Sequence, residues 1–494
     1  MHCVPPHAYG VEPAGNAYFR GDAEGMPRRG RGLGTLGLTS DAVVVEVLTY
    51  VPAAALAALA QCSTTLRAFA GLEDLWKGCC LGRAGRTKSA LSYAGASWRT
   101  SFTGRAAAIL DMTARRVYSD ALYRPHELAH SNTFSEESNA DELGPRRLCA
   151  ERNVLSLEQF VDEFERPAKP VVLRGAFSNA AAEPVWDESE IVSRFGDRAF
   201  HVGGYDFALK AFLDYARSNA DDQPLYLFDK NFAKTAPELA ALFEPPDFFR
   251  DDLFSNLCNR PDYRWLIIGG ARSGSAWHKD PNATSAWNAT LRGRKRWLLL
   301  PPHATPPGVR PSLDLLEVVA PLSISEWVRG FYAECRAMPQ LVEADAGPGD
   351  VVFVPRGWWH MVVNLEDYTV AVTQNFCSPA GLSATLRLLR DAPWLVSGIS
   401  RPRADAADAD ADGVGGSKDL AGARLCEELC AALKEHRPDV LARAEEEVLK
   451  PSLWAAITQP TAPAVEPGAP LQKKAKLDDA APQPAFAFGF SFDG

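Results

Sequence analysis

The apolar positions between residues 37 and 80 recur at the spacing of α-helices. Ser40 and Asp41 precede the first run and are suited to cap a helix N-terminus. Pro52 is suited to begin a second helix. The pattern therefore predicts three short helices, each of which buries one face. The apolar residues that define them are Leu38, Val44, Val47, Leu48 and Val51 in the first, Leu56 and Leu59 in the second, and Leu66, Phe69, Leu75 and Trp76 from the third onward.

From residue 155 onward, short apolar runs separated by turn residues replace the helical pattern. A helix predicted over residues 156–165 precedes runs that are rich in Val, Ile, Trp and Tyr, and these residue types favour strands. Short strands with turns between them are typical of an antiparallel sandwich or barrel. The predicted strands span residues 170–177, 263–270, 296–300, 351–355, 361–363 and 369–376.

Composition divides the rest of the chain. The first segment is rich in Gly, Arg and Pro without periodicity, which predicts a disordered tail. Leu425, Leu429 and Leu433 stand four residues apart and predict a late helix. The predicted organisation is a tail over 1–36, a helical domain over 37–105, a connecting segment over 106–150, a β-rich domain over 151–400, an acidic linker over 401–417, a helical segment over 418–457 and a second disordered tail over 458–494.

Charge and composition narrow the class of protein. The 494 residues are 46% hydrophobic and carry a formal charge of −10, so nucleic acid is not expected as a direct partner. The ten cysteines are scattered without a zinc-binding spacing, which indicates the reduced thiols of an intracellular protein. We expect no signal peptide and no membrane association. The basic cluster at residues 473–476 favours the nucleus, with the cytoplasm as the alternative.

His278 and Asp280 stand two residues apart in the segment SAWHKDP, residues 275–281. On a strand such a pair points to one face, because the side-chain period is two. An imidazole and a carboxylate together suit iron(II), and a facial site needs one further ligand from another strand. His360, at the end of the run PRGWWH, is suited to supply it. Three ligands on one face leave positions open for an oxoacid and dioxygen.

Several long runs resemble the JmjC family, in particular its phosphatidylserine-receptor type, which is described as a lysyl hydroxylase and arginine demethylase. The resemblance spans roughly residues 150–380 and includes FERPAKPVVLRGAF, PLYLFD, DDLF, WNATLRGRKRW and PRGWWH. It implies a mixed fold: a double-stranded β-helix (jelly-roll or cupin) JmjC core with flanking helices, preceded by the small all-α unit. It also implies that His278, Asp280 and His360 are the iron ligands.

The resemblance assigns roles to further residues. Lys295 matches the lysine that pairs with the distal carboxylate of 2-oxoglutarate, and Thr373 matches the hydroxyl that binds the same group. Asn288 and Tyr226 match polar groups of the cosubstrate pocket, although each has the alternative of a purely structural hydrogen bond. Strand alternation places Lys295 inward; its alternative is an exposed position in a basic run. Trp265, Ser275 and Asn375 are expected to line the same pocket.

The sequence departs from the family pattern at three places. Lys279 stands between two ligands and should face away from the metal. One extra residue near Asp367 falls in a predicted turn, so that Thr373 still faces inward. The basic C-terminal region typical of the receptor type is replaced by an acidic linker, which weakens any inference about RNA.

The helical domain resembles an F-box in its apolar spacing, Pro52 and the Leu75-Trp76 end. An F-box binds a Skp-type adaptor and recruits a cullin ubiquitin ligase. The alternative is an ordinary helical extension that packs on the main domain.

These observations predict an Fe(II)- and 2-oxoglutarate-dependent dioxygenase that consumes dioxygen, with ascorbate as a supportive reductant. Its expected reaction is the hydroxylation of protein side chains, with lysine preferred, on a lysine- or arginine-containing protein substrate. The alternatives are an N-methyl-arginine or N-methyl-lysine (histone) demethylase, and an F-box substrate receptor of a ubiquitin ligase. The complete set of His278, Asp280 and His360 favours catalysis.

Overall fold

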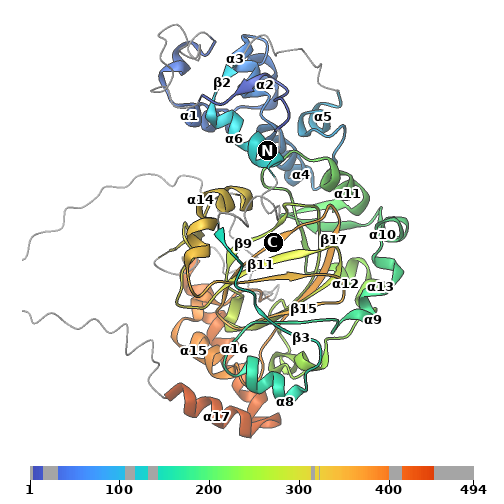
Figure 1. The fold of residues 1–494 in the computed structure, drawn as a ribbon, viewed down its shortest axis with the longest axis vertical. Helices are drawn as coiled ribbons and strands as arrows, with labels where there is room; N and C mark the ends of the chain where they lie inside the picture. Colours follow the sequence, from blue (N-terminus) through green and yellow to red (C-terminus); the bar gives the residue numbers. More distant parts are fainter. Residues whose placement is uncertain are drawn as a thin grey trace, which may run out of the picture.

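The computed structural model describes residues 4–14, 32–105, 117–131, 143–312, 317–321, 323–399 and 414–449. A helical unit lies at one end of a two-sheet β-domain, and further helices cover the other end (Figure 1). The basic cluster at 473–476 and the predicted tail over 458–494 lie outside the described residues. Among the helices of the described residues, none has both the length and the apolar character needed to cross a bilayer.

The helical unit contains the predicted short helices. The Ser40 hydroxyl caps the first of them by accepting the Val43 N–H at 3.3 Å. Leu48 and Trp76 are buried in its core, as the apolar pattern predicts, but Leu38 is exposed in a 3-10 turn before the first helix and Val47 is also exposed. Helical spacing predicts that apolar residues share one face of a helix, but it does not predict which of them another element buries. The helices are α1 (Asp41–Thr49), α2 (Ala53–Leu59), α3 (Thr64–Ala70), α4 (Glu73–Thr87) and α5 (Trp98–Thr103).

The helical unit extends beyond the predicted boundaries of 37–105. Strand β1 (Val11–Glu12) pairs in parallel with β2 (Val117–Tyr118), and α6 (Asp120–His130) packs against α1. Parts of the predicted tail over 1–36 and of the predicted connecting segment over 106–150 are therefore ordered pieces of this unit. A two-residue strand has too few positions to show a period, which explains why the prediction missed β1.

Two antiparallel-rich sheets form the β-domain, in agreement with the predicted jelly-roll. Their inner faces share an apolar cluster that includes Val352 from the larger sheet and Trp297 from the smaller. The larger sheet has the order β3-β4-β15-β10-β17-β8-β7-β5-β6 and the smaller β14-β11-β16-β9. The strands are β3 (Ala150–Arg152), β4 (Val171–Leu173), β5 (Ala199–Val202), β6 (Tyr205–Ala208), β7 (Leu227–Asp229), β8 (Arg264–Gly269), β9 (Gly274–His278), β10 (Ser285–Arg292), β11 (Lys295–Leu300), β14 (Val342–Ala346), β15 (Val351–Val354), β16 (Trp359–Asn364) and β17 (Thr369–Phe376).

Helices cover the outer faces of both sheets. α14 (Ile324–Ala337) lies on the smaller sheet, where Trp327 packs edge-on against Trp277 with ring centroids 5.3 Å apart. Shorter helices cover the larger sheet through a cluster that includes Phe160 and Trp287. They are α8 (Leu157–Phe160) with a π-turn over Val161–Glu165, α9 (Ser178–Ala181), α10 (Glu188–Phe195), α11 (Leu209–Ser218), α12 (Phe232–Thr235) and α13 (Pro237–Ala240).

The C-terminal helices pack together at the far end of the β-domain (Figure 1). They are α15 (Leu382–Asp391), α16 (Val414–His436) and α17 (Pro438–Leu449). Leu425, Leu429 and Leu433 are buried against α15 and α17, as their four-residue spacing predicts. The helix begins at Val414, inside the predicted linker over 401–417, because Ala and Gly composition does not itself prevent a helix whose later turns are packed.

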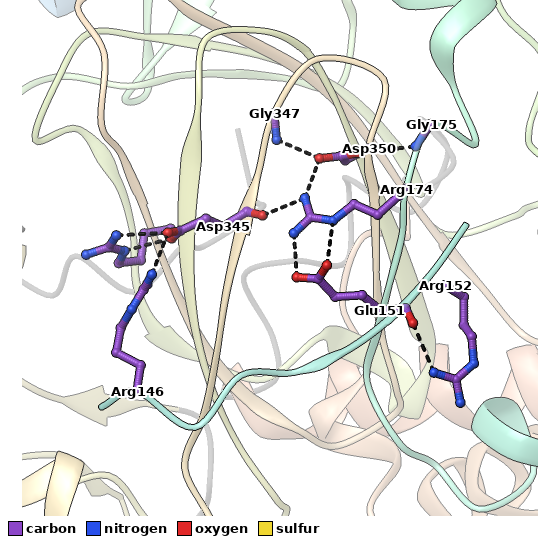
Figure 2. A network of polar contacts seen from close by, with 9 residues as sticks. Arg146, Glu151, Arg152, Arg174, Gly175, Asp345, Gly347 and Asp350 are labelled. Atoms are coloured by element: carbon purple, nitrogen blue, oxygen red, sulfur yellow. Dashed lines mark hydrogen bonds and ion pairs between the residues drawn. The ribbon is translucent and has the colours of Figure 1, made fainter. Parts of the chain in front are cut away.

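A polar network holds the edge of the larger sheet to the smaller one (Figure 2). Arg174 pairs with Glu151 and with Asp350, both at 2.5 Å, and also donates to the Asp345 carbonyl at 2.9 Å. The Asp345 carboxylate accepts from Arg296 at 2.7 Å. Arg296 therefore lies on the face of β11 opposite the barrel interior, as alternation predicts.

The helical unit contacts the β-domain at two separate places. Arg124 and Glu127 of α6 pair with Glu326 and Arg329 of α14 at 2.8 and 2.7 Å. On the other side, α4 and α5 lie beside α11 (Figure 1), where Lys77 pairs with Asp221 at 2.8 Å. These contacts attach the unit to both sheets' outer layers.

Candidate metal centre and adjoining polar pocket

Three predicted ligands meet inside the barrel. β9 ends at His278, β16 carries His360, and these two residues are direct partners in the antiparallel pairing. Asp280 follows β9 and precedes a short 3-10 turn, η9 (Pro281–Ala283). One ligand atom from each residue lies within 4.8 Å of the others, and His360 Nε2 lies 4.0 Å from Asp280 Oδ1. The structure thus brings His278, Asp280 and His360 to one point.

A β-bulge sets which side chains of β9 face inward. Between the pairs His278–His360 and Ser275–Val362, β9 advances three residues while β16 advances two. The extra residue lets both Ser275 and His278 share the inner face with their partners, while Trp277 turns outward to Trp327. Asp280 lies beyond the end of the strand, so the turn at Pro281 orients its side chain. The strand alternation that predicts the pair does not apply to it.

Backbone carbonyls orient both imidazoles. Nδ1 of His278 donates to the Ala276 carbonyl at 2.7 Å, and Nδ1 of His360 donates to the Trp358 carbonyl at 3.2 Å. A carbonyl only accepts, so Nδ1 carries the proton and Nε2 is left as the ligand atom. Burial lowers the pKa of each imidazole to about 4, and the neighbouring His360 adds to the effect at His278. Both rings are therefore neutral near pH 7, which is the form that binds metals.

The carboxylate completes a donor set suited to a divalent cation. Burial raises the pKa of Asp280, and the neighbouring His278 and Asn375 oppose this rise. Asp280 Oδ2 is buried without a hydrogen-bond partner among the described residues, which is costly for a carboxylate unless a cation is bound. Two imidazoles and one carboxylate are the protein ligands typical of non-haem iron(II). Lys279 turns away from them, since its Nζ donates to the Pro302 carbonyl at 3.1 Å.

A buried lysine lies in the same barrel. Lys295 on β11 is 1% exposed, and its Nζ donates to the Tyr226 hydroxyl at 3.0 Å. Burial lowers its pKa to about 7, and no carboxylate of the described residues pairs with it. A cation buried without a counter-ion is unfavourable, so the position suits an anionic ligand group. The exposed alternative for Lys295 is thus wrong.

Tyr226 packs on the larger sheet, beside a row of predicted site residues. Asn288, Thr373 and Trp265 are lateral neighbours on β10, β17 and β8, and Tyr226 packs with Trp265. The Thr373 hydroxyl donates to the Trp287 carbonyl at 2.9 Å, so it must rotate to donate to a carboxylate. Asn288 Oδ1 is buried without a hydrogen-bond partner among the described residues. Thr373 faces inward despite the extra residue before β17.

The other two predicted pocket residues differ in their positions. Ser275 is buried on the inner face of β9, and the bulge described above separates it from the outward Trp277. Asn375 Nδ2 donates to the Thr284 hydroxyl at 3.0 Å, so Asn375 supports the turn that follows Asp280. The structure places Ser275 on the barrel wall and Asn375 beside the ligand-bearing loop.

Sequence reasoning missed Asn364. This buried residue pairs with Lys295 across β16 and β11, and its Nδ2 donates to the Ser273 hydroxyl at 3.0 Å. Its amide also faces the Tyr226 hydroxyl and opposes the rise in that group's pKa that burial causes. Asn364 stands four residues after His360 on one strand, so alternation already placed both on the inner face. The sequence signal for Asn364 is therefore its even spacing from His360.

The close approach of β9 and β16 gives a test of the centre. A Cβ on Gly274 would overlap the Val362 carbonyl, so Gly274→Ala should push apart the strands that carry His278 and His360. We expect affinity for Mn(II), measured by anaerobic calorimetry, to fall by roughly tenfold or more. Gly330→Ala on α14 is the control, since nothing lies within 4 Å of its added Cβ. Equal affinities in both variants would contradict this account of the centre.

Comparison with known proteins agrees with the geometry. Residues 206–381 match the family model described as a cupin-like domain. The chain is 38% identical over 411 residues to "Arginine-specific demethylase JMJ22" of Arabidopsis thaliana, covering 80% of this chain and 79% of that protein. It is 39% identical over 267 residues to "Bifunctional arginine demethylase and lysyl-hydroxylase psr-1" of Caenorhabditis elegans (50% and 66%). Identity to "2-oxoglutarate and iron-dependent oxygenase JMJD4" of Danio rerio is 31% over 200 residues (37% and 44%). The chain therefore belongs to the JmjC family of cupin-like oxygenases that depend on iron and 2-oxoglutarate.

Proposed function

We propose that this oxygenase hydroxylates side chains of protein substrates, with lysine as the preferred residue. The observation that carries the proposal is that one barrel holds both the ligand set His278, Asp280 and His360 and the buried amine of Lys295. The first group suits iron(II) and the second suits the far end of a dicarboxylate.

The residues of the chain would divide the work as follows. His278, Asp280 and His360 would hold iron(II), which together with 2-oxoglutarate and dioxygen supplies the oxidant for a C–H bond and yields succinate and carbon dioxide. Lys295 and the Tyr226 hydroxyl would bind the distal carboxylate. Asn288 offers a buried amide oxygen without a partner among the described residues. The apolar walls, including Trp265, would exclude water from the reaction.

Demethylation is the second candidate reaction. The relative that matches 80% of this chain is named an arginine-specific demethylase, and psr-1 is named for both demethylation and lysyl hydroxylation. Hydroxylation of an N-methyl group and of a lysine side-chain carbon need the same iron chemistry and differ in which C–H bond reaches it. Mass spectrometry of lysine- and methylarginine-containing peptides separates them: a gain of one oxygen atom supports hydroxylation, and loss of a methyl group with release of formaldehyde supports demethylation.

Succinate release tests the oxygenase reaction itself. The purified chain, given iron(II), ascorbate and 2-oxoglutarate, should release succinate at a low rate without a protein substrate. The double variant His278→Ala/Asp280→Ala should release none, because two of three ligands are lost. Lys279→Gln should retain release, because Lys279 turns away from the ligands. An inactive wild type that also binds neither iron nor 2-oxoglutarate would overturn the proposal.

The low pKa of Lys295 predicts proton uptake when 2-oxoglutarate binds. Burial holds this pKa at about 7, so the amine is mostly neutral near pH 8. A bound carboxylate favours the ammonium form and raises the pKa, so binding near pH 8 should take up about one proton per site, and binding near pH 6 almost none. Calorimetry of the Mn(II)-loaded protein in buffers of different ionisation enthalpy measures this.

Lys295→Arg is the matched control for proton uptake. Arginine stays charged at every accessible pH, so this variant should bind without pH-dependent uptake. Wild-type uptake in the arginine variant would show that another group takes the proton.

We further propose that the F-box-like unit binds a Skp-type adaptor. Val43, Val47 and Tyr50 lie on one face of α1 and its end and are 47%, 45% and 62% exposed, and Leu38 before them is 90% exposed. Large apolar side chains grouped on one helical face favour a protein partner. Leu48 and Trp76 lie in the core of the unit, so their substitution would test folding instead.

The adaptor proposal predicts a separation of functions. Val43→Glu/Val47→Glu should abolish co-purification with a purified Skp-type adaptor and leave succinate release unchanged. Val154→Glu, at a valine that is 90% exposed on the β-domain, should affect neither. Adaptor binding that survives the double substitution, or that is absent in the wild type, would dismiss the proposal.

A further inference from the structure

Asp221 is a buried polar hub between the helical unit and the β-domain. Its carboxylate accepts from Lys77 of α4 at 2.8 Å, from the indole N–H of Trp98 of α5 at 3.2 Å and from the Tyr215 hydroxyl of α11 at 2.6 Å. The residue is 4% exposed. A buried carboxylate with three donors is held firmly, because each donor lost would leave part of its charge unsatisfied.

Arg272 connects this hub to the turn between β8 and β9. Its guanidinium Nη1 donates to the Asp221 carbonyl at 2.6 Å, and its backbone N–H donates to the Asn364 carbonyl at 3.0 Å. Arg272 has φ +69°, a left-handed conformation that costs free energy for a residue with a side chain. The hydrogen bonds of the Arg272 backbone and of its guanidinium therefore keep the turn in a conformation that it would not favour without them.

The same turn supports the groups that surround the Lys295 amine. The Asn364 N–H donates to the Ser273 carbonyl at 2.8 Å, and the Asn364 amide donates to the Ser273 hydroxyl at 3.0 Å. Asn364 then contacts the Tyr226 hydroxyl, which accepts from Lys295 at 3.0 Å. A series of hydrogen bonds, completed by the contact between Asn364 and Tyr226, therefore runs from the helical unit to the Lys295 amine.

Packing around Gly269 leaves this series little freedom to shift. A Cβ on Gly269 would overlap the Ser273 hydroxyl and would lie 2.7 Å from Tyr226 and 2.8 Å from the Asn364 amide. Three of the connecting side chains thus converge on a backbone with no side chain of its own. A displacement of the Ser273 side chain toward Gly269 would therefore be felt by Tyr226 and Asn364, which pack on the same backbone.

We propose that Asp221 and Arg272 are positioning residues for 2-oxoglutarate, through which the helical unit fixes the Lys295–Tyr226 pair that receives the distal carboxylate. The inference rests on the proposed oxygenase function and adds a role for the helical unit in it. Neither residue touches the cosubstrate; both act through the turn and Asn364.

Substitutions at the two ends of the series test the proposal. Arg272→Gln removes the bond to the Asp221 carbonyl, and Lys77→Met weakens the hub from the helical unit without touching the turn. Each should raise the Kd for 2-oxoglutarate by roughly threefold to thirtyfold, with the Kd for Mn(II) changed much less. Arg272→Lys, which can still donate to the carbonyl, should recover part of the affinity.

The measurement is calorimetric titration of 2-oxoglutarate into the Mn(II)-loaded full chain. Arg147→Gln is the matched control, since Arg147 donates to the Arg336 carbonyl at 2.8 Å at a different place in the β-domain; its Kd should equal that of the wild type. Wild-type affinity in folded Arg272→Gln and Lys77→Met would overturn the inference. Equal losses of Mn(II) and 2-oxoglutarate binding, with a lowered Tm, would also overturn it in favour of general stability. A wild type that does not bind 2-oxoglutarate would instead count against the proposed function.

Discussion

Two imidazoles and a carboxylate can share one cation only if strands that are distant in sequence keep a fixed register. Here the pairing of β9 with β16 sets His278 directly opposite His360, and the bulge in that pairing turns His278 inward. A slip of one residue would send a ligand to the opposite face. The crowding at Gly274, the outward anchor of Trp277 on Trp327 and the carbonyls that orient each ring all serve this register.

The second constraint is the cost of keeping an amine in the barrel. Lys295 has a hydroxyl partner and no paired carboxylate among the described residues, and burial lowers the pKa of its amine to about 7. The fold therefore accepts an unfavourable group at the position where a dicarboxylate would relieve it. A buried ionisable group without a charged partner is typical of a binding site and is not expected in a purely structural core.

The sequence predicted the chemistry better than the boundaries. The run SAWHKDP and the distant His360 are enough to predict a metal centre, because residue type and strand alternation indicate which side chains can be ligands. The geometry of Asp280 did not follow from that alternation, since it depends on a turn after the strand ends. The same alternation places Asn364 on the inner face with His360. β1 and the exposure of Leu38 depend on tertiary packing, which no local pattern encodes.

The two attachments of the helical unit, one through α6 and α14 and the other through Asp221, have a consequence for geometry. A unit held at one place can swing about it, whereas two separated contacts, each made by more than one pair of side chains, restrict that motion. Any protein seated on the exposed face of α1 would therefore be presented to the barrel at a fixed distance and angle. The position of the unit would then determine which part of a bound assembly can reach the iron centre.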